Sequence, residues 1–112
     1  MSNNPPDPSQ IIPGLYLSDY RASQSIEILD KHEITLIMNM TTKFPNKFES
    51  DPLLKDKFTY HQYQIKDDPN VDLYPIFESG TARIDDVLSK QKSILVHCEA
   101  GISRSASMVM AY

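Results

Sequence analysis

Apolar residues run almost without interruption through ITLIMNM, at residues 34–40. Such a run is typical of a strand that is buried on both faces, as in a parallel sheet covered by helices on each side. Shorter strand patterns occur at 15–17, at 58–65, where aromatic or aliphatic residues alternate with polar ones, and at 93–97. The pattern therefore predicts four strands.

Two segments between these strands have the periodicity of helices. In residues 24–32, Ser23 is the expected N-cap, and Ile26 and Leu29 are expected to point inward. In residues 73–91, the apolar face consists of Phe77, Ile84, Val87 and Leu88. Strands and helices in this order predict an α/β fold with a central, mostly parallel sheet flanked by helices.

The segment TTKFPNKFESDPLLKDK, at residues 41–57, is rich in charge and contains four lysines and two prolines. It is either a recognition surface or a solvated connection between two strands. We favour the connection, because loops between buried strands normally run over the surface and are polar.

Length and charge limit the class of protein. The 112 residues are enough for one domain, which we place at 11–112 after a flexible polar lead-in at 1–10. The net charge of -4 disfavours nucleic acid and anionic membranes as partners, and no apolar run approaches the ~20 residues of a membrane span. The N-terminus lacks the pattern of a signal peptide, and a single cysteine suits a reducing compartment. We therefore expect an intracellular protein, in the cytoplasm, the nucleus or both.

The one cysteine, Cys98, directly follows the strand at 93–97. By itself, such a residue is usually a small buried hydrophobe. Here a glycine-containing loop and the start of a helix near Arg104 follow it, and a strand, loop and helix N-terminus in this order form an anion-binding layout. The helix dipole would lower the thiol pKa from ~8.5 toward roughly 3.5–7.5, and the planar guanidinium of Arg104 can bind two phosphate oxygens. Gly101 allows the backbone to approach the anion closely.

His97, Cys98, Gly101, Arg104 and Ser105 match the HCxxGxxR(S/T) signature of the cysteine-dependent protein tyrosine phosphatase superfamily. Beyond the signature, HCEAGISRSASMVMAY is similar to the dual-specificity branch. The resemblance extends upstream through GLYLSD, IMNMT, FPNKFE and FTYHQYQIKDD, and the last two segments resemble the catalytic domains of MAP-kinase phosphatases. Relatives continue beyond this AY into further helices, so we expect the domain to be incomplete in its C-terminal helices.

The resemblance implies a role for each residue of the motif. Cys98 is the nucleophile, His97 supports it by orienting and polarising the thiolate, and Ser105 assists its release from the phosphoenzyme. The phosphate group of the substrate is expected to contact Glu99, Ala100, Gly101, Ile102, Ser103 and Arg104. Asn39 is expected to make a structural hydrogen bond near this loop.

A general acid is also needed, because the departing oxygen must take up a proton. In the family, this acid is an aspartate nine residues after the leading phenylalanine of a strand and five before an Asn or Asp. Counting forward from Phe58 and back from Asp72 gives Asp67 in both cases. Asp68 is the fallback, since Pro69 biases it toward an extended conformation. Without the cysteine motif, either residue would be interpreted as an exposed turn aspartate.

The expected activity is hydrolysis of phosphotyrosine and phosphoserine or phosphothreonine in proteins through a phosphocysteine, without a metal or a cofactor. The loop has Glu99 and Ala100 but no lysine, which disfavours phosphoinositides and RNA as substrates. A MAP kinase is one candidate partner. The alternative is a non-catalytic phosphoprotein-binding module, a pseudophosphatase, and the presence of both Cys98 and Arg104 favours the enzyme.

Overall fold

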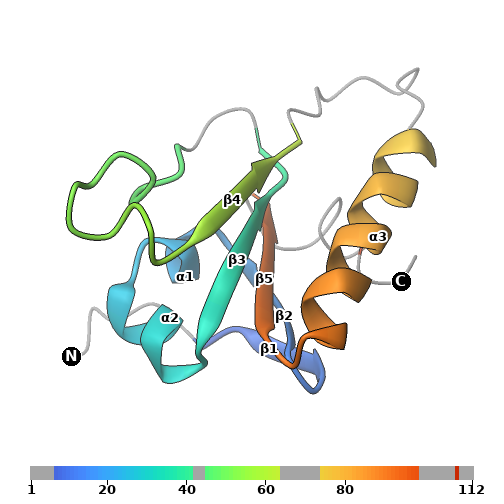
Figure 1. The fold of residues 1–112 in the computed structure, drawn as a ribbon, viewed down its shortest axis with the longest axis horizontal. Coiled ribbons are helices and arrows are strands. Elements are labelled where there is room, and N and C mark those ends of the chain that lie inside the picture. The colour runs from blue at the N-terminus through green and yellow to red at the C-terminus, as the bar shows by residue number, and fades with distance from the viewer. Residues whose placement is uncertain (1–6, 42–44, 64–73, 99–107, 109–112) are drawn as a thin grey trace.

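The computed structural model describes residues 7–41, 45–63, 74–98 and 108. Five strands form one sheet in the order β1-β2-β5-β3-β4 (Figure 1). The strands are β1 (Ser9–Ile12), β2 (Leu15–Asp19), β3 (Ile34–Asn39), β4 (Thr59–Gln62) and β5 (Ser93–Cys98). The β1–β2 pair is antiparallel, whereas the β2–β5, β5–β3 and β3–β4 pairs are parallel. The predicted α/β fold with a mostly parallel sheet is therefore confirmed.

Helices cover both faces of the sheet. The helices are α1 (Tyr20–Ser23), α2 (Ile26–Lys31) and α3 (Tyr74–Ser89). In Figure 1, α3 lies on one side of the sheet, and α1 and α2 lie on the other. The two central strands, β3 and β5, are therefore buried along nearly their whole length, which explains the continuous apolar runs in their sequences.

The core consists of two apolar clusters, one on each face of the sheet. The cluster under α3 includes Leu36, Met38, Ile84, Val87, Ile94, Val96, Cys98 and Met108. The cluster under α1 and α2 includes Ala22, Ile28, Leu29, Ile37, Phe48, Phe58 and Leu95, with Ile26 packed against it. Successive residues of a strand point to opposite faces, so Leu95 and Val96 belong to different clusters.

The helix predicted at 24–32 is observed as α2, but its N-cap is Ser25 and not Ser23. The Ser25 hydroxyl accepts a hydrogen bond from the backbone N–H of Ile28 at 3.3 Å. Ser23 instead ends the one-turn helix α1, and its hydroxyl donates to the carbonyl of Tyr20 at 2.6 Å. The prediction was wrong because α1 occupies the residues that were expected to lead into α2.

Strand β1 was not predicted, and it includes Ser9 and Gln10, which were expected in the flexible lead-in. These residues pair with Leu17 and Tyr16 of β2. The turn between the two strands contains Gly14 at a φ of 88°, a conformation that favours glycine. All of the β1 side chains are exposed, so the strand shows no alternation between apolar and polar positions.

The connection between β3 and β4 is mostly exposed where the structure describes it, at 45–58, but it also contributes to the core. The rings of Phe48 and Phe58 lie 5.9 Å apart in the cluster beneath α2. Leu53, by contrast, is 92% exposed. The Nζ of Lys47 donates to the carbonyl of Gln24 at 3.0 Å, which ties the connection to the segment between α1 and α2.

Candidate active site

Cys98 is the last residue of the central strand β5 and lies at the carboxyl edge of the sheet. Across the sheet, its Cα partner on β2 is Asp19, and the preceding residue, His97, pairs with Asn39 at the end of β3. Ligands of open α/β sheets bind outside the carboxyl ends of the strands. The fold therefore places the only cysteine at the edge where such a sheet binds its ligand.

The predicted loop residues 99–105 and the candidate acids Asp67 and Asp68 lie outside the described residues, so their roles stay predictions. The structure does describe where the segment that carries Asp67 and Asp68 begins. The backbone N–H of Tyr63, directly after β4, donates to the carbonyl of Asn39 at 2.9 Å. Asn39 pairs with His97, the residue before Cys98. The segment that carries Asp67 therefore starts at the carboxyl ends of the strands, where Cys98 also lies.

His97 is 1% exposed, and burial lowers its pKa from 6.5 to about 4. A hydrogen bond with the backbone of Cys98 and the charge of Asp19 act in the opposite direction, but they do not overcome the desolvation. The imidazole is therefore neutral at physiological pH. A neutral buried imidazole argues against His97 as a proton acceptor in solution, and its predicted role in supporting Cys98 stays a prediction.

The buried histidine predicts a specific sensitivity to acid. Because its pKa is depressed in the folded state, the unfolded chain binds a proton between pH 6.5 and 4 that the folded chain does not. From pH 7 to pH 4.5, this difference costs about 2.5 kcal/mol of the free energy of unfolding. Urea unfolding of the wild type and His97→Gln at both pH values measures this loss. Between pH 7 and pH 4.5, the free energy of unfolding of the wild type should fall by about 2.5 kcal/mol more than that of the variant. An equal fall in both proteins would contradict the prediction.

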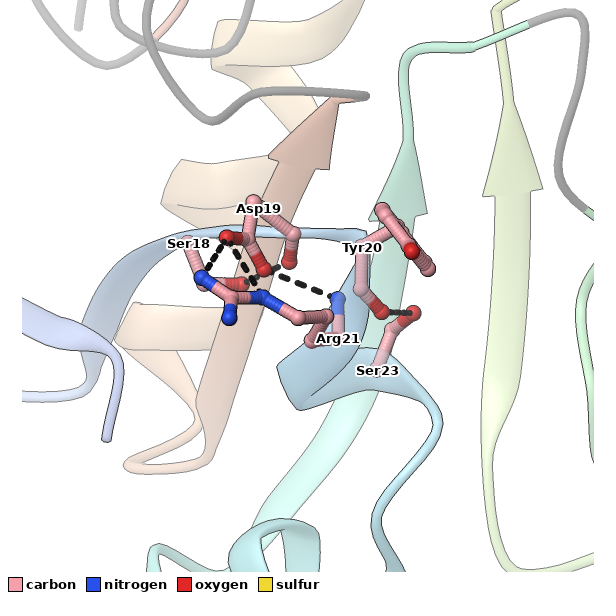
Figure 2. Close-up of polar contacts among 5 residues, drawn as sticks. All are labelled: Ser18, Asp19, Tyr20, Arg21 and Ser23. Carbon is pink, nitrogen blue, oxygen red and sulfur yellow. Dashed lines mark hydrogen bonds and ion pairs between the residues drawn. The ribbon is translucent and has the colours of Figure 1, made fainter. Parts of the chain in front are cut away.

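The carboxylate of Asp19 is a feature of the site that the sequence did not predict. Figure 2 shows the Arg21 side chain folded back onto it, with Nη2 at 2.7 Å and Nε at 3.0 Å from Oδ2. The same carboxylate caps α1 by accepting from the backbone N–H of Arg21 at 2.9 Å. These hydrogen bonds lower the pKa of Asp19, so it is ionised and paired. The signal available in the sequence was the aspartate itself, because aspartate is a common N-cap.

Asn39 joins the end of β3 to the chain that follows. Its Oδ1 accepts from the backbone N–H of Thr41 at 3.0 Å, and its Nδ2 donates to Oδ1 of Asn46 at 2.9 Å. The side chain is fully buried, and its hydrogen bonds explain how a polar residue is accommodated in an apolar strand. Asn39 thus makes structural hydrogen bonds at the end of β3, and its expected position near the loop after Cys98 stays a prediction, because that loop lies outside the described residues.

Within the described ranges, no three His, Cys, Asp or Glu side chains are arranged to hold a metal ion. Among the helices of the same ranges, none is long and apolar enough to cross a membrane.

A mostly parallel sheet whose central strand ends in His97 and Cys98, six residues before Arg104, has the architecture of a cysteine-dependent phosphatase domain. Residues 15–112 match the model of the family described as dual specificity phosphatase, catalytic domain. The chain belongs to this family.

Two human proteins illustrate the relationship in sequence. The chain is 40% identical to human dual specificity protein phosphatase 7, over 99% of its own length and 26% of that protein. It is 36% identical to human dual specificity protein phosphatase 6, over 100% of its own length and 29% of that protein. The chain thus spans between a quarter and a third of the length of these relatives.

Solved structures show the same fold. Human DUSP28 is 28% identical with a TM-score of 0.82, covering 96% of this chain and 69% of that one. DUSP15 is 30% identical with a TM-score of 0.81, covering 95% and 64%. The human tyrosine phosphatase-like serine/threonine/tyrosine-interacting protein is 32% identical with a TM-score of 0.77, covering 95% and 71%.

Proposed function

We propose that the protein is a dual-specificity protein phosphatase, whose catalytic domain at 11–112 hydrolyses phosphotyrosine and phosphoserine or phosphothreonine through a phosphocysteine. The observation that carries this proposal is the position of Cys98. It ends the central strand at the ligand-binding edge of the sheet, beside a neutral buried histidine, and the phosphatase signature continues from it to Arg104.

The proposed reaction has two displacement steps. In the first, the Cys98 thiolate attacks phosphorus, so a P–S bond forms while the P–O bond to the substrate breaks, and Asp67 gives its proton to the departing oxygen. In the second, a water that loses its proton to the Asp67 carboxylate attacks the phosphocysteine, and the P–S bond breaks with assistance from Ser105. Arg104 and the backbone amides of 99–103 stabilise the three equatorial oxygens throughout, so neither a metal nor a cofactor takes part.

A carboxylate lies on the strand beside Cys98, and a neighbouring arginine offsets part of its charge. A carboxylate on the neighbouring strand would raise the thiol pKa if its charge were uncompensated. Arg21 pairs with that carboxylate, Asp19, through two side-chain hydrogen bonds. Arg21 therefore offsets part of the negative charge at the end of β2, and the proposed thiolate depends on the loop amides and Arg104.

Phosphorylated proteins are the proposed substrates. The absence of lysine from 99–103 leaves the loop less basic than a highly anionic lipid or RNA would require. A MAP kinase is a candidate partner, supported by the resemblance of the PNKFE and FTYHQYQIKD segments to MAP-kinase phosphatases. Such a substrate places the proposed activity inside the cell, in the cytoplasm, the nucleus or both.

A second candidate function is phosphoprotein binding without turnover. It is favoured by the similarity to the tyrosine phosphatase-like serine/threonine/tyrosine-interacting protein, at 32% identity. The enzyme remains the better proposal, because this chain has both the nucleophile Cys98 and the phosphate-binding Arg104.

Phosphopeptides that differ only in the phosphorylated residue separate these functions. With phosphotyrosine, phosphoserine and phosphothreonine peptides in excess EDTA, the protein is expected to release inorganic phosphate from all three over many turnovers. Release of phosphate from the phosphotyrosine peptide alone would contradict the proposed dual specificity. Binding of the peptides without release of phosphate would support the phosphoprotein-binding module instead. Loss of activity in EDTA, restored by a divalent metal, would contradict the metal-free mechanism.

A further inference from the structure

A groove of about 360 Å³ lies between β4 and α3, at the β4 edge of the sheet. Its apolar lining consists of Leu36 of β3 and of Ala82 and Val87 of α3. Its polar lining consists of His61 of β4 and of Ser79, Arg83 and Asp86 of α3. A hollow lined by apolar residues and a few polar groups has the form of a small ligand site.

Hydrogen bonds connect four polar side chains at the groove into one cluster: Arg83, His61, Tyr63 and Ser79. Nη1 of Arg83 lies 2.8 Å from Nε2 of His61, and Nε of Arg83 donates to the hydroxyl of Tyr63 at 3.1 Å. That hydroxyl lies 2.8 Å from Oγ of Ser79. A guanidinium only donates hydrogen bonds, so Nε2 of His61 must be the acceptor, and the ring is neutral with its proton on Nδ1.

The cluster has a positive charge that its own members do not neutralise. Within the described residues, the hydrogen bonds of Arg83 go to a neutral imidazole and a neutral phenol. Asp86, which also lines the groove, accepts a hydrogen bond from Nζ of Lys90 at 3.1 Å. Burial and, secondarily, the charge of Arg83 lower the pKa of His61, as expected for an imidazole that would become a second cation beside the first.

The groove is separate from the proposed catalytic centre. His61 pairs with Met38, which pairs with Val96, two residues before Cys98. Two strand spacings of ~4.8 Å and a rise of ~6.8 Å over two residues place the Cα atoms of His61 and Cys98 about 12 Å apart. A group bound between β4 and α3 therefore does not occupy the position of a phosphate that reacts with Cys98.

We propose that this groove is an oxyanion site that takes a phosphate group, with Arg83, His61 and the hydroxyls of Tyr63 and Ser79 as its ligands. A tetrahedral oxyanion accepts hydrogen bonds from a guanidinium in a two-pronged arrangement and from hydroxyls as well. It would place a negative charge beside Arg83, whose hydrogen-bond partners in the described part of the chain are an imidazole and a phenol. The proposal does not depend on catalysis, since it concerns binding alone.

Binding and protonation should be linked at this site. Without a ligand, a proton on Nε2 of His61 would break its hydrogen bond with Arg83 and place two cations side by side. An oxyanion between them accepts from both, so it favours the protonated ring. By linkage, the anion therefore binds more tightly as the pH falls, with uptake of a proton by His61.

Sulfate is a suitable probe, because it stays doubly charged between pH 6 and pH 8 whereas phosphate does not. The experiment follows the ring signals of His61 by two-dimensional NMR during a sodium sulfate titration at constant ionic strength. We expect a saturable shift, with a dissociation constant at least threefold lower at pH 6 than at pH 8. Arg83→Gln should abolish the saturable shift, whereas Lys57→Gln, which removes a surface cation paired with Asp30, should leave it unchanged.

Two further arms identify the source of the phosphate group, using the same His61 signals in Cys98→Ser protein so that no ester is hydrolysed. Tighter binding of a phosphoserine peptide than of inorganic phosphate would assign the site to a phosphorylated polypeptide, and the reverse order would assign it to free phosphate. Weak sulfate binding that is independent of pH and unaffected by Arg83→Gln would mean an adventitious ion only and would overturn the proposal. If Arg83→Gln does not fold, Tyr63→Phe replaces it and should weaken the binding measurably.

Discussion

Cys98→Ser is expected to abolish turnover while leaving the fold intact. A serine hydroxyl keeps its proton at neutral pH, so it cannot replace the thiolate that attacks phosphorus. Removal of a catalytic nucleophile commonly costs at least ~10⁴-fold in rate, and a loss of that size is expected here. The substitution is nearly isosteric, and Cys98 is 4% exposed within the cluster under α3, so the packing should change little.

The measurement is steady-state release of phosphate from an aryl phosphate by wild type, Cys98→Ser and Cys98→Ala. The two variants should be equally inactive, because the thiolate is absent from both. Thermal unfolding and binding of an unreactive phosphate analogue show whether the variants are folded and whether the phosphate-binding loop still functions. Substantial turnover by a folded Cys98→Ser protein would refute the phosphocysteine mechanism. This outcome does not depend on whether an oxyanion binds in the groove at Arg83.

The parts of the fold that the sequence predicted are those in which burial dominates. Strands β3 and β5 are flanked by strands on both sides and covered by helices on both faces, so nearly every residue is buried and most are apolar. Helix α3 shows the expected periodicity because one of its faces packs on the sheet, through Ile84 and Val87. In both cases, a single environment extends over several residues and leaves a regular pattern.

Elements that are short or exposed could not be predicted in this way. Strand β1 is held by its backbone pairing with β2, and its side chains are all exposed. Helix α1 is a single turn held by the cap of Asp19, so its four residues are too few to show a period. The wrong N-cap for α2 follows from this omission, because Ser23 and Ser25 are equally good caps when judged from sequence alone.

In the candidate site, too, some features could be predicted from the sequence and others could not. His97 and Cys98 were predicted because they belong to a contiguous motif. The approach of Asp19 to the end of β5 depends on the register between β2 and β5, which the sequence does not state. The contact of Arg83 with His61 likewise joins residues 22 positions apart and requires α3 to lie along β4. Contacts of this kind appear only once the topology is known.

Asp67→Asn is expected to lower kcat by ~10²–10⁴-fold, the usual contribution of a positioned general acid. The segment that carries Asp67 begins after Tyr63, which is hydrogen-bonded to the end of β3. The segment thus starts at the carboxyl end of β4, two strands away from β5, and Cys98 lies at the carboxyl end of β5. Asp68→Asn is the matched control, since it removes the same charge from the adjacent position and should leave kcat near the wild-type value.

The size of the loss should depend on the leaving group. A phenol has a pKa near 10, so a departing phenolate needs less help from an acid than the more basic alkoxide of serine or threonine. Asp67→Asn should therefore impair phosphoserine and phosphothreonine peptides more than phosphotyrosine peptides, and it should remove the fall in kcat at high pH that reports deprotonation of the acid. If Asp68→Asn shows these effects and Asp67→Asn does not, the acid is Asp68, and the count from Phe58 does not hold in this chain. If neither variant shows them, the proton comes from a group outside this segment, because a carboxamide cannot replace a carboxylic acid as a proton donor.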